Sequence, residues 1–218
     1  DEMKRYGLLL AILLVLVAGA TTQELVYFEG DIRVYERVEG DLFELQDSQE
    51  GLIGFGYVLD PGYVVKTFDG IAEILLPNGH VLKLAEETEV QLQSVIARGA
   101  SSGEDVVSVA GGRLRSVVSS LTGTGRGFQV RTPTAVGGVR GTDFVTQVAG
   151  NEEIIAVSEG LVNFTNSAGT SISLAANQFA NALGESFAAA QADVVSQFYG
   201  NLDQLSDQAQ EARQAVLA

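Results

Sequence analysis

The strongest constraint on the fold is a long series of short segments, between residues 25 and 180, in which apolar and polar residues alternate. A period of two is typical of half-buried strands. Glycine-containing turns separate the segments, and Asn78-Gly79 between two of them indicates a hairpin. The segments predicted as strands are 25–28, 31–38, 42–45, 57–59, 63–68, 71–76, 80–84, 89–96, 106–109, 113–118, 128–131, 143–148, 153–157, 161–165 and 170–174. Such a series without intervening helices predicts an all-β domain over residues 25–182.

A glycine followed by alternating apolar residues recurs three times. The three stretches are EGDIRVY at 29–35, GGRLRSV at 111–117 and EGLVNFT at 159–165. Units of one turn and one strand can stack so that they share a core, but the spacing between these three is irregular. We therefore expect an irregular β-solenoid-like or two-sheet β domain, not a closed barrel, followed by a C-terminal α-helix.

Residues 1–20 have the three parts of a secretory signal peptide. Lys4 and Arg5 precede an apolar run over 8–18, and the small residues Ala18-Gly19-Ala20 follow. The run is about half the ~20 apolar residues that a membrane-spanning helix needs. We therefore predict export to the periplasm or the cell exterior, with a mature chain that begins near Thr21. The alternative is an uncleaved anchor over residues 8–20, in which case the membrane would be a partner.

The C-terminal segment changes to a helical period. Residues 186–218 are poor in glycine and rich in alanine and glutamine, which predicts an amphipathic helix. Its apolar positions alternate in steps of three and four residues, and they are Val195, Phe198, Leu202, Leu205, Ala209, Ala212 and Val216. We expect this seam to pack on the β domain of its own chain, because it is short and interrupted by Gly200. Weak self-association through residues 195–216 is the alternative.

Composition excludes several classes of function. The chain has 28 acidic and 13 basic residues, a net charge of −15, so it repels phosphate backbones and nucleic acid is not an expected partner. It has no cysteine and a single histidine, His80, which excludes thiolate chemistry and histidine-cluster metal sites. His80 is expected on the surface, and Glu86, Glu87 and Glu89 are expected to form a solvated acidic turn. We therefore predict no cofactor, no metal and no enzymatic activity.

The middle of the chain is locally basic. Over residues 106–150 one acid, Asp143, accompanies five arginines, and these could receive an acidic partner or pair with the acidic first part of the chain. We favour the internal pairing. The five arginines are Arg113, Arg115, Arg126, Arg131 and Arg140.

Two motifs carry a family resemblance. Residues 132–144 read TPTAVGGVRGTDF, and residues 157–164 read VSEGLVNF. They resemble the extracytoplasmic domain of the FecR family, whose members carry TP-x-A, V-R-G-T-x-F and V-x-E-G-x-V segments. A degenerate similarity upstream, over 59–92, extends the resemblance to roughly residues 28–182. It implies an exported β domain of the sensing or scaffolding kind.

The N-terminus departs from the family pattern. The regulators that give the family its name carry a cytoplasmic sigma-factor-binding domain before a transmembrane helix, whereas here a short stretch with two basic residues, Lys4 and Arg5, precedes the apolar run. Anti-sigma activity is therefore not expected. The function expected is that of a non-enzymatic binding, sensing or scaffold module in the cell envelope, with an envelope protein of unknown identity as its partner. A membrane-anchored signalling component, with residues 8–20 retained, is the alternative.

The motif residues are the candidate site. We expect Arg140 to be a buried structural cation, held among glycines and paired with Asp143 or another acid. The alternative is that Arg140 and Asp143 line a partner-binding edge. Val136 and Phe144 are expected in the core. The residues assigned to the structural motif, or to partner binding, are Thr132, Pro133, Arg140, Gly141, Thr142, Asp143, Phe144, Glu159 and Gly160.

Overall fold

The protein is mostly β, as the alternating pattern predicts. The computed structural model describes residues 22–45, 53–97, 100, 102–120, 125–181 and 192–218. The expected signal peptide over 1–20 lies outside these residues. Among the described residues, no helix has both the length and the apolar character that crossing a membrane requires.

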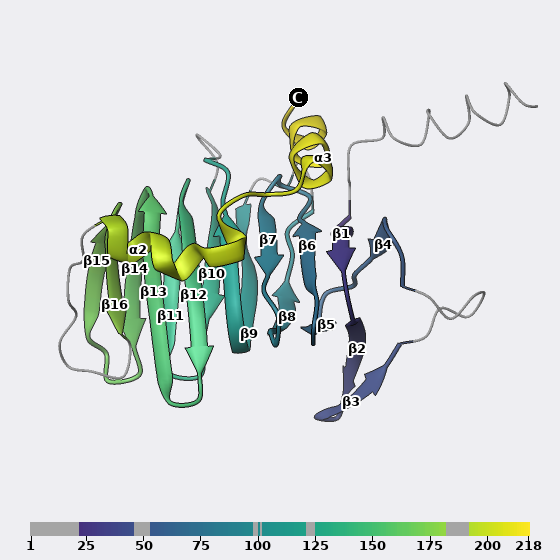
Figure 1. Ribbon diagram of the computed structural model, residues 1–218, viewed down its shortest axis with the longest axis horizontal. Coiled ribbons are helices and arrows are strands. Elements are labelled where there is room, and N and C mark those ends of the chain that lie inside the picture. The colour runs from purple at the N-terminus through teal and green to yellow at the C-terminus, as the bar shows by residue number, and fades with distance from the viewer. Residues whose placement is uncertain (1–21, 46–52, 98–99, 101, 121–124, 182–191) are drawn as a thin grey trace, which may run out of the picture.

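In the described part of the chain, sixteen strands form two layers that share one long strand (Figure 1). Sheet A has the order β4 (Tyr57–Val58), β1 (Glu24–Glu29), β6 (Ile71–Leu75), β7 (Val81–Leu84), β9 (Ser102–Val117), β12 (Asp143–Ala149), β13 (Glu152–Glu159) and β16 (Gln178–Asn181). Sheet B has the order β3 (Asp41–Glu44), β2 (Ile32–Val38), β5 (Val64–Thr67), β8 (Glu89–Ser94), β9, β10 (Gly125–Arg131), β11 (Ala135–Val139), β14 (Leu161–Asn166) and β15 (Ser171–Ala175). β9 and β10 run parallel, and the other described pairs are antiparallel.

Strand β9 passes from one sheet to the other. Its first part pairs with β8 and β10 in sheet B, and its last residues pair with β7 and β12 in sheet A. The corner lies at Gly112, which has a φ of +84° and whose added Cβ would lie 2.4 Å from the Thr88 Cα. Glycine is needed here for both reasons. The glycine pair at 111–112, interpreted above as a break between two strands, is instead the bend of one strand.

The core lies between the two sheets. Phe128 of sheet B meets Phe144 of sheet A edge to face, with ring centroids 6.3 Å apart. Both rings are buried, in one continuous apolar cluster that contains residues of both layers. Phe144 is thus in the core as expected, whereas Val136, the other expected core residue, is 38% exposed on β11.

The C-terminal segment forms a third layer on the outer face of sheet A. Helix α2 (Ala192–Tyr199), the 3₁₀-helix η1 (Gly200–Leu202) and helix α3 (Asp207–Leu217) replace the single helix expected over 186–218. Gly200, with a φ of +46°, starts the break between the two helices. Residues 186–191 lie outside the described part of the chain. In Figure 1, α2 crosses the strands of one half and α3 lies near β6 and β7 of the other.

The apolar seam packs on its own domain, as we expected. Ala209 and Val216 of α3 pack on Leu75, Val81 and Val117 of sheet A. Val195 and Tyr199 of α2 pack in the same way on Val145 and Ala156. The outer face of sheet A therefore carries two apolar clusters that the C-terminus of the same chain covers.

Two strands, β11 and β16, are absent from the sequence-based prediction. Gly137 and Gly138 lie in the middle of β11, and glycine is a poor indicator of a strand. The glycines have a packing role: an added Cβ at Gly137 would lie 3.1 Å from Val130 and 3.5 Å from Ile155 of the opposite sheet. Short β16 follows directly after the Asn177 turn, where the sequence indicates a loop.

Candidate functional site

A row of charged side chains crosses the outer face of sheet A. In the strand register Glu73 on β6 stands opposite Lys83 on β7, and Lys83 stands opposite Arg115 on β9. The Lys83 ammonium lies 3.3 Å from the Glu73 carboxylate. The three residues are only 0%, 6% and 9% exposed, in that order. Because buried charges require polar partners, whatever covers this face must satisfy them.

The segment that joins the two C-terminal helices supplies these partners. Arg115 donates a hydrogen bond from Nη1 to the carbonyl of Leu202 at 2.6 Å. Lys83 donates from Nζ to the carbonyl of Gln204. Both acceptors are main-chain oxygens of the segment 202–206, so its backbone is held against the sheet by the side chains beneath it.

A third contact fixes the start of α3. The carboxylate of Glu73 accepts hydrogen bonds from the N–H and the hydroxyl of Ser206, at 3.1 and 2.5 Å. The same hydroxyl accepts the N–H of Ala209 at 3.1 Å, which makes Ser206 the N-cap of α3. Positions 202, 204 and 206 thus each meet one member of the charged row, and every second residue of the segment is anchored.

Asp143 of the VRGTD motif completes the row. It forms a two-point ion pair with Arg115, Nε to Oδ1 at 3.0 Å and Nη2 to Oδ2 at 2.6 Å. Burial disfavours the charged form of Arg115, but the pair with Asp143 outweighs this and leaves its pKa above the ordinary value. The ring of Tyr199 lies 5.5 Å from the guanidinium, and its hydroxyl donates to the carbonyl of Asp143 at 3.1 Å. Burial, and next the charge of Asp143, raise the pKa of Tyr199 above its ordinary value.

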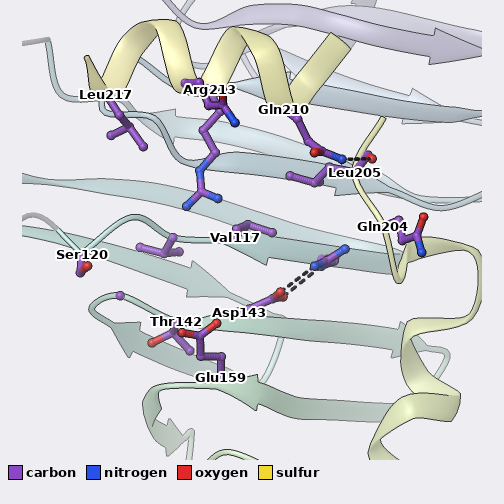
Figure 2. Close-up of a pocket in the computed structure, with 14 residues that line it drawn as sticks. Val117, Ser120, Thr142, Asp143, Glu159, Gln204, Leu205, Gln210, Arg213 and Leu217 are labelled. Atoms are coloured by element: carbon purple, nitrogen blue, oxygen red, sulfur yellow. Dashed lines mark hydrogen bonds and ion pairs between the residues drawn. The ribbon is translucent and has the colours of Figure 1, made fainter. Parts of the chain in front are cut away.

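A cleft of about 550 Å³ opens between α3 and the strand ends where β9 finishes and β12 begins (Figure 2). Its sheet side includes Val117, the motif residues Gly141, Thr142 and Asp143, and Glu159 at the end of β13. In Figure 2 the Glu159 carboxylate points toward the open space. Two sequence motifs, VRGTD and SEG, therefore meet at one wall.

The C-terminal segment provides the opposite wall. Gln204, Gln210, Gln214 and Arg213 line it, and Leu217 closes one end. Figure 2 shows the Arg213 guanidinium reaching down from α3 toward the sheet. The cleft exists because the C-terminus is docked, since neither wall alone encloses it.

Arg213 is half-buried and is held by neutral groups. It donates from Nε to the carbonyl of Gly79 at 3.1 Å and from Nη2 to the hydroxyl of Ser119 at 3.2 Å. Burial lowers its pKa from the ordinary value. Within the described residues the structure records no ion pair for Arg213. Its positive charge in the cleft is therefore incompletely balanced.

The motif glycines let the two turns of the sheet wall interlock. Gly160 has a φ of +87°, and an added Cβ would lie 2.5 Å from the carbonyl oxygen of Gly141. Gly141 has a φ of +61°, and its Cβ would lie 2.7 Å from that of Ser120. Thr142 bonds through its hydroxyl to the carbonyl of Leu161 at 3.1 Å and so ties the turns together. The backbone of the site requires glycine at both positions.

The expectation of a buried Arg140 is wrong. Arg140 is exposed, and its expected partner Asp143 pairs with Arg115 on the neighbouring strand. The register explains this, because β12 lies beside β9 and brings Asp143 within reach of Arg115. For Arg115 the favoured pairing with the acidic first part of the chain is therefore wrong, because its ion pair is with Asp143. Arg113 likewise turns to the C-terminus, where it donates to the carbonyl of Phe198 at 3.3 Å.

Thr132 and Pro133 do not line the cleft. The hydroxyl of Thr132 accepts the N–H of Ala135 at 3.0 Å and bonds to the buried carboxylate of Glu153. Glu153 also accepts the N–H of Thr134 at 3.1 Å. This end of the motif holds a turn in shape around a buried acid, while Pro133 is exposed.

The expectation of a surface His80 is also wrong. His80 is 3% exposed, accepts the N–H of Ser119 at Nδ1 at 3.1 Å, and places Nε2 3.4 Å from Asp105. Its ring meets the edge of Phe128 in the core. The Asn-Gly turn is covered by α3, because Leu217 lies beside Gly79. Within the part of the chain that the structure describes, no group of three or more His, Asp or Glu residues could hold a metal ion.

Sequence reasoning missed Glu73, Lys83, Arg115, Ser206 and Arg213 as site residues. One signal was available: Glu73 and Lys83 interrupt the apolar strands IAEILL and HVLKL on either side of a hairpin. Opposite charges facing each other within apolar strands indicate a paired and covered position. The contacts with the C-terminus gave no such signal.

Comparison with known proteins finds a family match in the central part of the chain. Residues 63–163 match the family model described as FecR protein, which confirms the resemblance. No curated protein matches the chain. Two crystal structures of a putative anti-sigma factor from Parabacteroides distasonis ATCC 8503 are similar, with 20% identity and a TM-score of 0.49. Each match covers 60% of this chain and 61% of the other, so this chain spans about three-fifths of that protein's length.

Proposed function

We propose that this protein is an exported, non-enzymatic FecR-like β domain that acts as a binding, sensing or scaffold module in the cell envelope. The observation that carries the proposal is the polar cleft, which lies where the VRGTD turn, the SEG turn and α3 meet. Concave sites with a few convergent polar groups are the usual places of ligand binding. The match of residues 63–163 to the FecR family supports an envelope role.

The arrangement of the cleft favours binding over catalysis. Asp143 and Arg115 hold each other in a two-point ion pair, and Arg213 is held by two neutral acceptors. Groups held in this way by charge-assisted and neutral hydrogen bonds are oriented for recognition.

The alternative proposal is a membrane-anchored signalling component with residues 8–20 retained as the anchor. The apolar run over 8–18 motivates both alternatives. N-terminal sequencing of the protein recovered from a bacterial envelope separates them. A chain that begins near Thr21 supports the exported module, and a chain that retains Met3 in the membrane fraction supports the anchored component.

Binding at the cleft can be tested by photo-crosslinking in intact cells. A photoreactive residue at Gln210, which is exposed on the helix wall, should give discrete covalent adducts. The same residue at Ser173, exposed on β15 away from the cleft, is the matched control. Equal adduct yields at the two positions would contradict a binding role for the cleft.

A further inference from the structure

We propose that the cleft binds a short peptide with free amino and carboxyl termini. The inference rests on the proposed binding function and names the ligand class of the same site. The Arg213 guanidinium on one wall takes the ligand carboxylate, and the Glu159 carboxylate on the other wall takes its ammonium group.

Arg213 is the anion-binding group of the cleft. Its two recorded hydrogen bonds go to the Gly79 carbonyl and the Ser119 hydroxyl, neither of which carries charge. Burial lowers its pKa, although the charges of Asp143 and Glu159 act in the opposite direction. A guanidinium in this state gains most from a carboxylate, because charge-assisted hydrogen bonds are about twice as strong as neutral ones. The two bonds also fix its orientation, so little freedom is lost when a ligand binds.

Glu159 is the cation-binding group. It is exposed on the sheet wall at the end of β13, and within the described residues no ion pair or side-chain hydrogen bond is recorded for it. The other acid of the cleft, Asp143, is already committed to Arg115. Glu159 attracts Arg213 across the cleft without forming an ion pair, so one charge of each sign faces a ligand from opposite walls.

The remaining lining groups fit peptide bonds. Gln204 and Gln214 line the helix wall, and no side-chain hydrogen bond is recorded for either within the described residues. A primary amide both donates and accepts, which matches the N–H and C=O of a peptide unit. Val117 and Leu205 add apolar surface for small side chains.

Other ligand classes fit less well. A nucleotide or another polyanion would meet one available guanidinium and the opposing charge of Glu159. The described residues that line the cleft include no aromatic ring, so they offer no stacking surface for a base or a sugar. A peptide with free termini can pair with both Arg213 and Glu159, and its peptide bonds can bond to the amides of Gln204 and Gln214.

Calorimetric titration of the full chain with three forms of trialanine tests the proposal. Trialanine with free termini should bind at least about fivefold more tightly than N-acetyl-trialanine or trialanine amide, because each cap removes one charge-assisted contact. Glu159→Gln should abolish the discrimination against the acetylated form and retain that against the amide. Arg213→Gln should do the opposite. Glu152→Gln, at an exposed acid at the other end of β13, should change neither.

Each result has a definite meaning. Equal binding of free and capped trialanine, or no binding of the free form at millimolar concentration, would overturn the inference. If Arg213→Gln unfolds the protein, the Glu159→Gln titration decides, because that side chain is exposed and its replacement leaves the core intact. A cleft that gives adducts at Gln210 but binds no trialanine would refute the peptide inference and leave the binding function standing. If Gln210 gives no more adducts than Ser173 and trialanine does not bind, both the binding function and the peptide inference are refuted.

Discussion

The carboxylate of Glu73 accepts both the N–H and the hydroxyl of Ser206, which lies 133 residues further along the chain. One end of this contact is a fully buried acid on β6, inside the FecR-family match, and the other is the cap of α3. With the Lys83–Gln204 and Arg115–Leu202 contacts, it makes the C-terminal segment a fixed layer of the domain. The candidate cleft depends on this layer for one of its walls.

Removing Lys83 should destabilise the protein strongly. Lys83→Met leaves the buried Glu73 carboxylate without its cation, which costs about 3–5 kcal/mol when one partner of a buried pair is lost. Urea unfolding at neutral pH measures the change. Lys66→Met is the matched control, because the Lys66–Glu89 pair has the shorter distance of 2.9 Å but is partly exposed. The control should lose less than about 1 kcal/mol.

The two arginines Arg115 and Arg140 should differ in the same assay. Arg115→Ala removes the ion pair with Asp143 and the bond to Leu202, and should lower the free energy of unfolding by about 3–5 kcal/mol. Arg140→Ala should leave the melting temperature nearly unchanged, because the side chain is exposed. Equal losses from the two variants would mean that the motif arginine carries a structural role after all.

The contrast between these arginines shows what the sequence could predict. Period-two alternation located nearly all the strands, because the side-chain direction in a strand depends on local spacing alone. The partner of Asp143 depends on which strand lies beside β12, and this follows from the path of β9 between the sheets. Arg140 is near Asp143 in the chain, whereas Arg115 is near it in the sheet. The bond between Glu73 and Ser206 joins residues still further apart, and no local pattern marks it.

The glycine at the SEG turn should be essential for the motif wall. Gly160→Ala combines a positive φ with a Cβ only 2.5 Å from the carbonyl oxygen of Gly141, so the two turns must separate. We expect a loss of more than about 2 kcal/mol in urea unfolding. Gly138→Ala is the control, because its backbone is not left-handed and an added Cβ has no neighbour within 4 Å. Its effect should be within about 0.5 kcal/mol of zero.

Tyr199 should make stability fall at alkaline pH. Burial raises its pKa in the folded state above the ordinary value of 10.0, so the folded protein retains the phenolic proton where the unfolded chain releases it. The resulting contribution is complete below about pH 10 and is lost as the pH rises toward the folded-state pKa. The difference in unfolding free energy between wild type and Tyr199→Phe should therefore shrink from about pH 10 upward. A difference that grows over this range would contradict the assigned burial.

Hydrogen exchange of the full chain, followed by mass spectrometry, tests most directly whether the C-terminus is a fixed layer of its own domain. Amides of α3 depend for protection on the docking of Ala209 and Val216 and on the Ser206 anchor. We predict that they exchange as slowly as the amides of β6 and β7, and at the same rate after tenfold dilution, because the contacts lie within one chain. Exchange at the rate of a free peptide, or protection that disappears on dilution, would contradict the account.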